Sequence, residues 1–394
     1  MSKENTLLKL GSIFNHLAPY QFIKASALLL QGVQVNEEQN QSISVQWDLF
    51  EEVYIHFKDQ EVSPITESAT QASFIMSFEG ISVQVECQFN RTVKTDPYRI
   101  SVTHKGEPIW VQSMYAFLYD KTLNEKYGKE IHAYLSQAQH DITKINHSAW
   151  NQEQYDALTQ RYGDPHILAD KIGENPTWRL HPFYKHMGLL SGKKVVHLLG
   201  SNGIKGVALS LLGADVTIVD FSKENAQYAK KLAGFAETTI EYIQSDVFSI
   251  PETDLKGDAD FVLMELGVLH YFVDLHPLIK IIRSILKQGG QFLLHEFHPI
   301  STKLITSTGK KHKVTGNYFD PEIEIRNVAF SKHIENGDQE SLAKVSQRKW
   351  TIGEVVTAIA KEGLVIKVLE EEPNHKIHDI GLPKTYTILA EKTN

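Results

Sequence analysis

The feature that most constrains the fold is an alternation of short apolar runs with helix-like stretches between residues 194 and 297. Five runs, KVVHLL, DVTIVD, IEYIQSD, DFVLMEL and QFLLHEF, have the length and apolar content of buried strands. Strands that alternate with helices pair in parallel through right-handed crossovers. This part of the chain is therefore predicted to be α/β, a doubly wound, Rossmann-like sheet with helices on both faces.

The chain changes character near residue 145, and 394 residues are enough for two domains. Before that point, apolar and polar residues alternate in short strand-like runs, and Glu79-Gly80 is predicted to be a tight turn between two of them. We therefore expect a small α+β accessory domain over 1–145, and a second domain over 146–394. Within the second domain, 146–190 is predicted to be a helical cover and 301–349 an excursion on the substrate side.

The charge and the cysteine content limit which partners the protein is expected to bind and which cellular compartment it is expected to occupy. A formal charge of −8 argues against an extended nucleic-acid surface, which needs clustered basic residues. Cys87 is the single cysteine, which fits a reducing compartment such as the cytoplasm. We find no signal peptide and no membrane segment. The sequence leaves open whether the chain forms a homodimer.

The turn after the first run, LGSNG, is predicted to bind a nucleotide. Ligands of doubly wound sheets bind at the carboxyl ends of strands, where glycines let the backbone approach closely. Asp220 ends the second run about twenty residues later, where a carboxylate can accept both ribose hydroxyls. This pattern indicates adenosine binding without separating NAD from S-adenosylmethionine. The cofactor-binding residues predicted here are His197, Gly200, Ser201, Asn202, Gly203, Asp220, Phe221 and Ser222.

Later features favour S-adenosylmethionine. Asp246 ends the third run and Val247 follows it, and a carboxylate at this position can accept from an adenine amino group. The chain ends in two strand-like runs, 364–372 and 386–392, instead of a further strand–helix unit. Residues from about 150 to 394 resemble the class I S-adenosylmethionine-dependent methyltransferases that act on small molecules. The resemblance implies a seven-stranded sheet with an antiparallel last strand, and S-adenosylmethionine as cofactor.

The glycine loop departs from the pattern of that family, which has an acidic residue followed by Leu-Gly-x-Gly-x-Gly. His197 stands at the acidic position, Leu199 at the first glycine, Ser201 at the second and Gly203 at the third. A histidine there cannot order the methionine amino group by charge as a carboxylate would.

Methyl transfer from a sulfonium mainly requires alignment, and a base helps only when the acceptor carries a proton. Candidates should follow the fourth and fifth runs, and we predict catalytic roles for Glu265, His270, Glu296 and His298. Glu265 could instead contact the cofactor. We predict substrate contacts for Tyr271, Trp178 and Tyr184. No metal is predicted, because neighbouring residues of a strand point to opposite faces, so His295 cannot join Glu296 and His298.

The sequence thus predicts a methyltransferase that moves a methyl group from S-adenosylmethionine to a small-molecule acceptor. Two alternatives stay open: an S-adenosylmethionine-binding regulatory protein without turnover, and an NAD-dependent oxidoreductase. The N-terminal half weakly resembles a degenerate nucleotidyltransferase-like domain through QWDLFEEVYIHF and ISVQVECQFNRTV. Residues 42–46 lack the paired carboxylates of active members, and Glu86 is interpreted as a single remnant of such a site. We interpret this half as a recognition or oligomerisation module.

Overall fold

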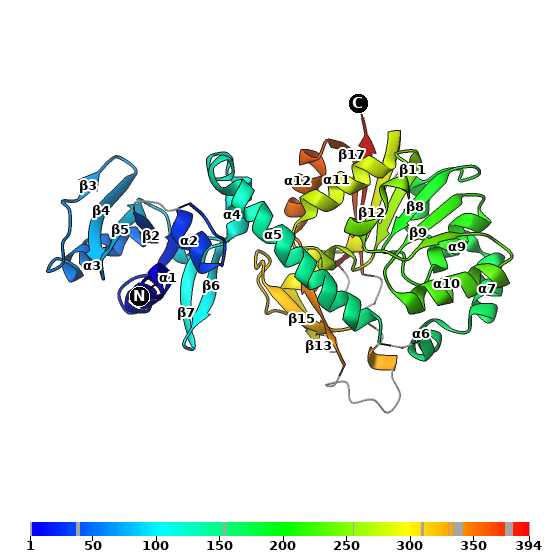
Figure 1. Ribbon diagram of the computed structural model, residues 1–394, viewed down its shortest axis with the longest axis horizontal. Helices are drawn as coiled ribbons and strands as arrows, with labels where there is room; N and C mark the ends of the chain where they lie inside the picture. Colours follow the sequence, from blue (N-terminus) through cyan, green and yellow to red (C-terminus); the bar gives the residue numbers. More distant parts are fainter. Residues whose placement is uncertain are drawn as a thin grey trace. The chain divides into compact units, whose positions relative to one another are not determined.

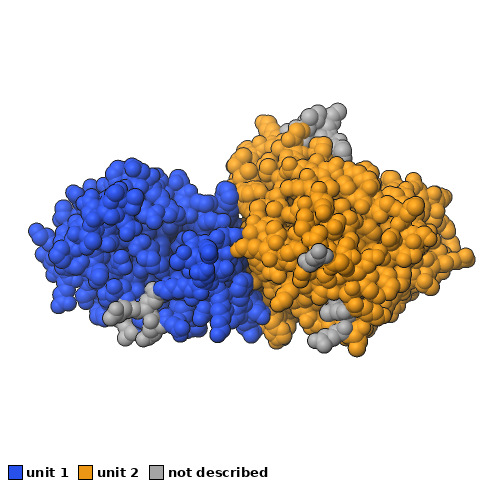
Figure 2. Space-filling model, turned by 90° about the horizontal axis from the view of Figure 1, so that it is seen from above, with its two compact units in different colours: residues 1–137, 319–321 blue, residues 138–318, 322–394 orange. Residues whose placement is uncertain are grey.

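The computed structural model describes residues 2–36, 40–152, 155–254, 256–308, 311–329, 331–333, 342–374 and 381–393. The chain divides into two compact units, residues 1–137 with 319–321 and residues 138–318 with 322–394 (Figure 2). The division falls within one long helix, α5 (Lys121–Trp150), which begins in the first unit and ends in the second. The sequence analysis placed the change at residue 145, further along this helix.

The N-terminal unit is built on a mixed seven-stranded sheet with the order β3-β4-β5-β2-β1-β7-β6 (Figure 1). The turn predicted at Glu79-Gly80 is confirmed: both residues have positive φ, 44° and 82°, and β4 and β5 pair antiparallel on either side. The strands are β1 (Tyr20–Ile23), β2 (Gln41–Val45), β3 (Thr66–Glu67), β4 (Gln71–Phe78), β5 (Ile81–Gln88), β6 (Arg99–His104) and β7 (Glu107–Gln112). The helices are α1 (Lys3–Phe14), α2 (Lys24–Leu30), η1 (Trp47–Leu49), α3 (Phe50–His56), η2 (Val93–Thr95) and α4 (Met114–Tyr119).

The C-terminal unit contains the predicted doubly wound sheet, with the order β10-β9-β8-β11-β12-β18-β17. The first five strands pair in parallel, whereas β18 runs antiparallel to both β12 and β17, which confirms the antiparallel end of the sheet. The strands are β8 (Lys194–Leu198), β9 (Asp215–Val219), β10 (Glu241–Ile243), β11 (Ala259–Glu265), β12 (Leu286–Phe297), β17 (Leu364–Pro373) and β18 (Pro383–Lys392).

Helices cover both faces of this sheet (Figure 1). On one face, α6 to α10 pack against one another and share an apolar core with strand residues such as Val195 and Leu263. On the other face, α11 and α12 pack together; α11 buries Leu278, Ile279 and Ile282 along a helical stripe. The helices are α6 (Tyr155–Tyr162), α7 (Pro165–Glu174), α8 (Pro176–Arg179), η3 (Phe183–His186), α9 (Ile204–Leu211), α10 (Lys223–Phe235), η4 (Val247–Ser249), η5 (Glu252–Asp254), η6 (Leu269–Tyr271), α11 (Leu275–Ile285) and α12 (Ile352–Lys361).

The excursion predicted at 301–349 is present between β12 and α12. It opens with a short π-helix, η7 (Ile300–Leu304), and continues through a first hairpin of β13 (Ile305–Thr308) with β14 (Lys311–Val314). The described part then contains η8 (Ser331–His333) and a second hairpin of β15 (Ile323–Asn327) with β16 (Lys344–Arg348). The Asn146 side chain of α5 exchanges two hydrogen bonds with the Ser346 backbone, at 2.8 and 3.1 Å, so α5 is attached to β16.

Candidate functional site

The loop between β8 and α9 keeps a glycine-like backbone even where glycine is absent. Leu199 and Ser201 have φ values of 51° and 50°, and Gly203 has 74°, so all three positions are left-handed. Left-handed backbone costs a non-glycine residue roughly 1–2 kcal/mol. A Cβ added to Gly200 or Gly203 would meet Ile218 at 2.7 Å or Ala229 at 2.6 Å. The loop therefore packs tightly against β9 and α10.

Asp220 joins this loop to the end of β9. Its two carboxylate oxygens accept hydrogen bonds from the backbone N–H of Ser201, at 3.1 Å, and of Ser222, at 2.9 Å. Burial raises the pKa of Asp220, and these two hydrogen bonds oppose the rise. Each carboxylate oxygen has a second lone pair. Asp220 can thus brace the loop and still accept hydrogen bonds from a ribose.

Asp246 caps η4 at the end of the third parallel strand. Its carboxylate accepts from the backbone N–H of Phe248 at 3.0 Å, and burial raises its pKa. Ser222 caps α10 by accepting from the N–H of Asn225 at 3.2 Å. Ser222, predicted to contact the cofactor, is buried at the N-terminus of α10 and is not among the residues that line the cavity.

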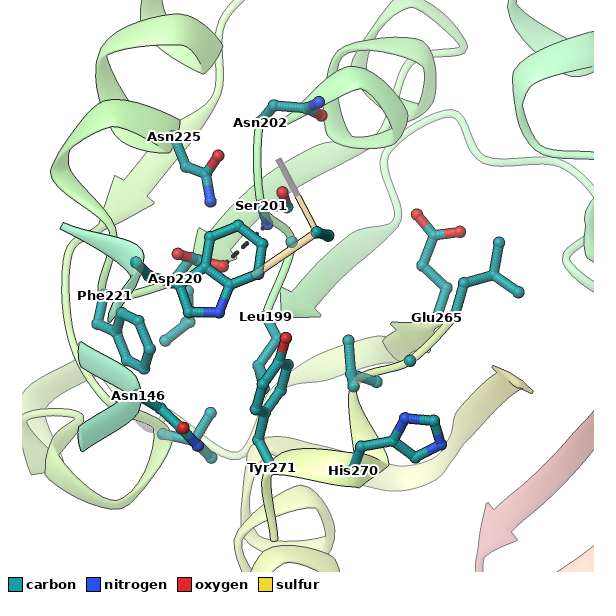
Figure 3. A pocket seen from close by; sticks show the side chains of 18 of the residues that line it. Asn146, Leu199, Ser201, Asn202, Asp220, Phe221, Asn225, Glu265, His270 and Tyr271 are labelled. Atoms are coloured by element: carbon teal, nitrogen blue, oxygen red, sulfur yellow. Dashed lines mark hydrogen bonds between the residues drawn. The ribbon is translucent and has the colours of Figure 1, made fainter. Parts of the chain in front are cut away.

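These strand ends surround one cavity of about 670 Å³ (Figure 3). In that view Asp220 and Glu265 lie on opposite sides, with Tyr271 pointing into the space between them. Of the predicted cofactor residues, those that line the cavity are Gly200, Ser201, Asn202, Asp220, Phe221, Asp246, Val247 and Glu265. Of the other predictions, His270, Tyr271 and Trp178 also line it.

Glu296 was predicted to be catalytic, but the structure places it elsewhere. Its buried carboxylate accepts from the backbone N–H groups of Gly267 at 2.5 Å, Val268 at 3.0 Å, Leu269 at 3.3 Å and Phe297 at 2.7 Å. Burial raises its pKa, and these donors oppose the rise. Glu296 does not line the cavity; it holds the loop that leads to His270.

His298 and Tyr184 also lie apart from the cavity lining. The buried His298 ring bonds the Glu371 carboxylate at 2.6 Å and accepts from the Ile300 N–H at 3.1 Å. Tyr184 is half-buried against the apolar core of α7 to α10. His298 therefore connects η7 with β17 outside the cavity lining, and Tyr184 contributes to packing.

His197 lies beneath the glycine loop, between the loop and Glu265. The ring is 1% exposed, and neither of its nitrogens has a hydrogen-bond partner within the described ranges. Burial, followed by the nearby Lys205 ammonium, lowers the pKa of His197 to about 3. The ring is therefore neutral at physiological pH. Its Nε2 lies 3.9 Å from Glu265 Oε1, while the other Glu265 oxygen pairs with Lys205.

His270 and Tyr271 form the opposite wall of the cavity. Burial, followed by the Lys349 charge, lowers the pKa of His270 to about 4, so this ring is also neutral. The Tyr271 hydroxyl receives hydrogen bonds from the side chains of Trp150 and Gln347, and burial raises its pKa to about 12. Tyr271 therefore stays protonated. Because its oxygen receives both hydrogen bonds, its own O–H can still donate to an acceptor atom in the cavity.

The sequence analysis missed one whole wall, which α5 supplies. Gln139, Thr143, Asn146 and Trp150 line the cavity. The Gln139 amide also binds the Tyr271 carbonyl at 3.0 Å and the Val273 N–H at 2.8 Å. The spacing of i, i+4, i+7 and i+11 marks one helix face, and this periodic signal was present in the sequence. The assignment of most of α5 to the accessory domain concealed it.

The helical cover adds a second set of residues that sequence reasoning did not name. Arg161 and Arg179 line the cavity and lie over the rings of Tyr162 and Trp178, at 4.9 and 4.5 Å from the ring centroids. Burial lowers the pKa of Arg179, and its Nε has no hydrogen-bond partner in the part of the chain that the structure describes. Lys205, in the first turn of α9, completes a cationic end of the cavity.

The lining fits an adenosine cofactor that carries an amino acid. Asp220 and Asp246 supply hydrogen-bond acceptors at one end, and the other end holds cations, the Glu265 carboxylate and the N-terminus of α9, which favours anions. Among the described residues, no group of three or more His, Cys, Asp or Glu side chains is arranged to hold a metal ion. Within the same residues, no helix has the length and apolar character needed to span a membrane.

In the N-terminal unit, the lone carboxylate Glu86 is engaged in an ion pair with Lys24 at 2.8 Å. This side chain is the one that the sequence analysis singled out in the degenerate nucleotidyltransferase-like half. The pair joins β5 to the start of α2, and the Lys24 side chain is partly exposed.

Residues 199–294 match the family model of a methyltransferase domain. The chain is also similar to two solved structures. One is an S-adenosylmethionine-dependent methyltransferase from Mesorhizobium loti, 20% identical, with 57% of this chain and 99% of that chain covered and a TM-score of 0.44. The other is the magnesium protoporphyrin IX methyltransferase from Synechocystis PCC 6803 with bound SAH, 13% identical, with 64% and 100% covered and a TM-score of 0.39. A comparison with curated proteins gave no match.

Proposed function

We propose that the C-terminal unit, which is a class I S-adenosylmethionine-dependent methyltransferase domain, transfers the methyl group to a small-molecule acceptor. One observation carries the proposal. The residues suited to the cofactor and the neutral His270 ring line the same continuous cavity. Its volume of about 670 Å³ lies within the range of small-molecule sites.

The chain's own residues divide the cavity into regions with different tasks. Asp220 offers lone pairs to the ribose hydroxyls, and Asp246 with Val247 forms the adenine side. The glycine loop and Glu265 form the amino-acid side. When bound, S-adenosylmethionine supplies a methyl group already activated by its sulfonium, so the protein contributes mainly alignment. The acceptor would then lie beside His270 and Tyr271, which follow β11.

His270 and Tyr271 together limit what the acceptor can be. The neutral imidazole can accept a hydrogen bond from the acceptor's N–H or O–H, and the Tyr271 hydroxyl can donate one to a neighbouring atom. A ring with a pKa near 4 is too weak a base to remove a proton from an amine or from its methylated product, so it can orient the acceptor through a hydrogen bond without taking its proton. This favours an amine, or another nucleophile with a free lone pair, over an unactivated alcohol.

Calorimetry with three ligands tests the choice of cofactor. S-adenosylmethionine and its demethylated product should bind with a dissociation constant on the order of micromolar, about −8 kcal/mol, and NAD should give no heat. Binding of NAD alone would overturn the proposal in favour of an oxidoreductase.

A second experiment tests turnover. Incubation with methyl-labelled S-adenosylmethionine and pools of amines, carboxylates and phenols, followed by mass spectrometry, should yield a labelled product. A protein that binds the cofactor but labels nothing across these classes would instead support the regulatory alternative.

For the N-terminal unit we propose an accessory role in recognition or oligomerisation. Residues 1–137 have their own sheet and helices, and the cavity lining begins at Gln139. Size-exclusion chromatography with light scattering on the full chain and on a variant that lacks residues 1–110 would show whether this unit sets the oligomeric state. A variant that keeps the state and the acceptor profile of the full chain would contradict this role.

A further inference from the structure

We propose that Glu265 is the carboxylate that receives the ammonium group of the cofactor's amino-acid part, and that Lys205 and the buried His197 set its position. The inference rests on the proposed function and deepens it. It gives a binding role to a carboxylate whose role the sequence left open. It also gives positioning roles to a lysine that the sequence analysis did not name and to a histidine that does not itself line the cavity.

The register of the sheet brings His197 and Glu265 together. His197 of β8 pairs with Leu263 of β11, and Glu265 lies two residues further along the same strand. Residues two apart in a strand share a face, so both side chains project toward the α9 side of the sheet. Their facing atoms, His197 Nε2 and Glu265 Oε1, are 3.9 Å apart, and the two side chains are only 2% and 13% exposed.

The chemistry of His197 explains why it would act through Glu265. A neutral ring carries one N–H, and a buried N–H without an acceptor is destabilising because it has lost its hydrogen bond to water. The separation of 3.9 Å is beyond a hydrogen bond, but a shift of the carboxylate by about 1 Å would bring it to bonding distance. His197 then donates to Oε1 and leaves the remaining lone pairs of Glu265 directed at the cavity.

Lys205 fixes the other oxygen. It lies in the first turn of α9 and pairs with Glu265 Oε2, and both side chains line the cavity. The amino-acid part of the cofactor carries one ammonium and one carboxylate. A lysine and a glutamate held side by side offer the complementary pair of charges. Arg161 and Arg179 line the same cavity and are positively charged like Lys205. Glu265 therefore supplies the negative charge that can pair with the cofactor's ammonium group at this end.

Two ligands separate this role from a general effect on the site. S-adenosylhomocysteine carries the amino-acid part, whereas 5′-methylthioadenosine keeps the adenosine and the sulfur and lacks it. Glu265→Gln should weaken S-adenosylhomocysteine by at least about tenfold and leave methylthioadenosine within about twofold, because only the first ligand loses a charged partner. His197→Leu should change the ratio of the dissociation constants for S-adenosylhomocysteine and methylthioadenosine by about threefold or more, because Glu265 loses the support of the His197 ring.

A swap of the carboxylate sharpens the test. The double variant His197→Asp with Glu265→Gln moves the charge to the neighbouring strand, on the same face, and should recover at least about half of the lost binding free energy. His295→Gln is the matched control, since His295 is a buried histidine on that face that bonds Thr387 at 2.9 Å. It should leave the ligand ratio unchanged. Melting curves of every variant show which ones are folded.

The outcomes distinguish a failure of the proposed Glu265 role from a failure of the proposed function. If Glu265→Gln weakens both ligands equally, or neither, while the folded wild-type protein binds both, the role of Glu265 is refuted and the methyltransferase proposal stands. If the wild-type protein binds neither ligand, the proposed function itself fails.

Discussion

The ends of β11 and β12 carry the same residue type and use it in opposite ways. Glu265 ends β11, lines the cavity and pairs with Lys205. Glu296 lies one residue before the end of β12, is 2% exposed, and accepts hydrogen bonds from four backbone N–H groups. One carboxylate faces the cavity, and the other holds the loop that forms part of the cavity wall.

The difference follows from the register between the two strands. Glu265 pairs with His295, so His295 shares its face, and Glu296 must point to the other side of the sheet. A shift of β12 by one residue would bring Glu296 to the same side of the sheet as Glu265 and turn His295 away. Residue type and position at a strand end therefore do not identify a catalytic group until the neighbouring strand is aligned.

The largest expected effect is on stability, and it separates the two carboxylates directly. Glu296→Ala leaves four backbone N–H groups without their acceptor and should lower the free energy of unfolding by about 3 kcal/mol or more. Glu265→Ala should cost less than Glu296→Ala, because the partner it leaves, Lys205, lines the cavity and can be hydrated there. Urea unfolding of both variants measures the difference, and equal losses would break the comparison.

Asp220 combines both uses, because it braces the loop and also lines the cavity. Asp220→Ala should weaken S-adenosylhomocysteine by about 1.5–3 kcal/mol, because the ribose hydroxyls lose a charged acceptor. Titration calorimetry gives this number. Asp215→Ala, at the exposed opposite end of β9, is the control and should bind as the wild-type protein does. An Asp220 variant with unchanged affinity would remove Asp220 from the cofactor site.

The two histidines that follow these strands extend the comparison to turnover. His270→Asn should reduce kcat/KM by about tenfold, a barrier change of about 1.4 kcal/mol, and leave cofactor affinity within about twofold. His298→Asn should lower the melting temperature without a comparable loss of turnover, because His298 bonds Glu371 and Ile300 outside the cavity.

The pH dependence of the wild-type protein tests the same assignment. The pKa of His270 is lowered to about 4, so the ring stays unprotonated as pH falls from 8 to about 5.5 and protonates only near 4. The contribution of His270 to turnover should therefore be constant across that range. An acid limb near pH 6.5 that disappears in His270→Asn would show an ordinary, solvated histidine instead.

The smallest effect concerns the end of β8, where backbone shape rather than a side chain matters. Ser201 has φ of 50°, so Ser201→Gly should relieve strain and raise the free energy of unfolding by roughly 0.5–1 kcal/mol. Ser201→Val, with a β-branched side chain, should lower it by a similar or larger amount. Thermal melts of the two Ser201 variants show whether each one gains or loses stability. Destabilisation by glycine would contradict the inference that the backbone is strained at Ser201.

Much of the C-terminal fold could be predicted because its evidence is local. The apolar runs, the turn after β8 and the position of Asp220 all lie within short windows of sequence, and parallel pairing follows from the alternation itself. The α5 wall was missed for the opposite reason. Gln139 contacts a loop 132 residues away, and no local pattern states which unit a helix face will meet.

The sequence by itself determined the order of strands and helices and the carboxylates at the strand ends, because these depend on residue spacing and backbone preference, whereas the antiparallel last strand was implied by the family resemblance. Tertiary structure decided which of those side chains reach the cavity. Register turned Glu265 inward and Glu296 away, and packing over β8 left the His197 ring without a hydrogen-bond partner among the described residues, with Nε2 facing Glu265. The physical reason is that a side chain's direction is fixed by its own strand, whereas its neighbours come from distant parts of the chain.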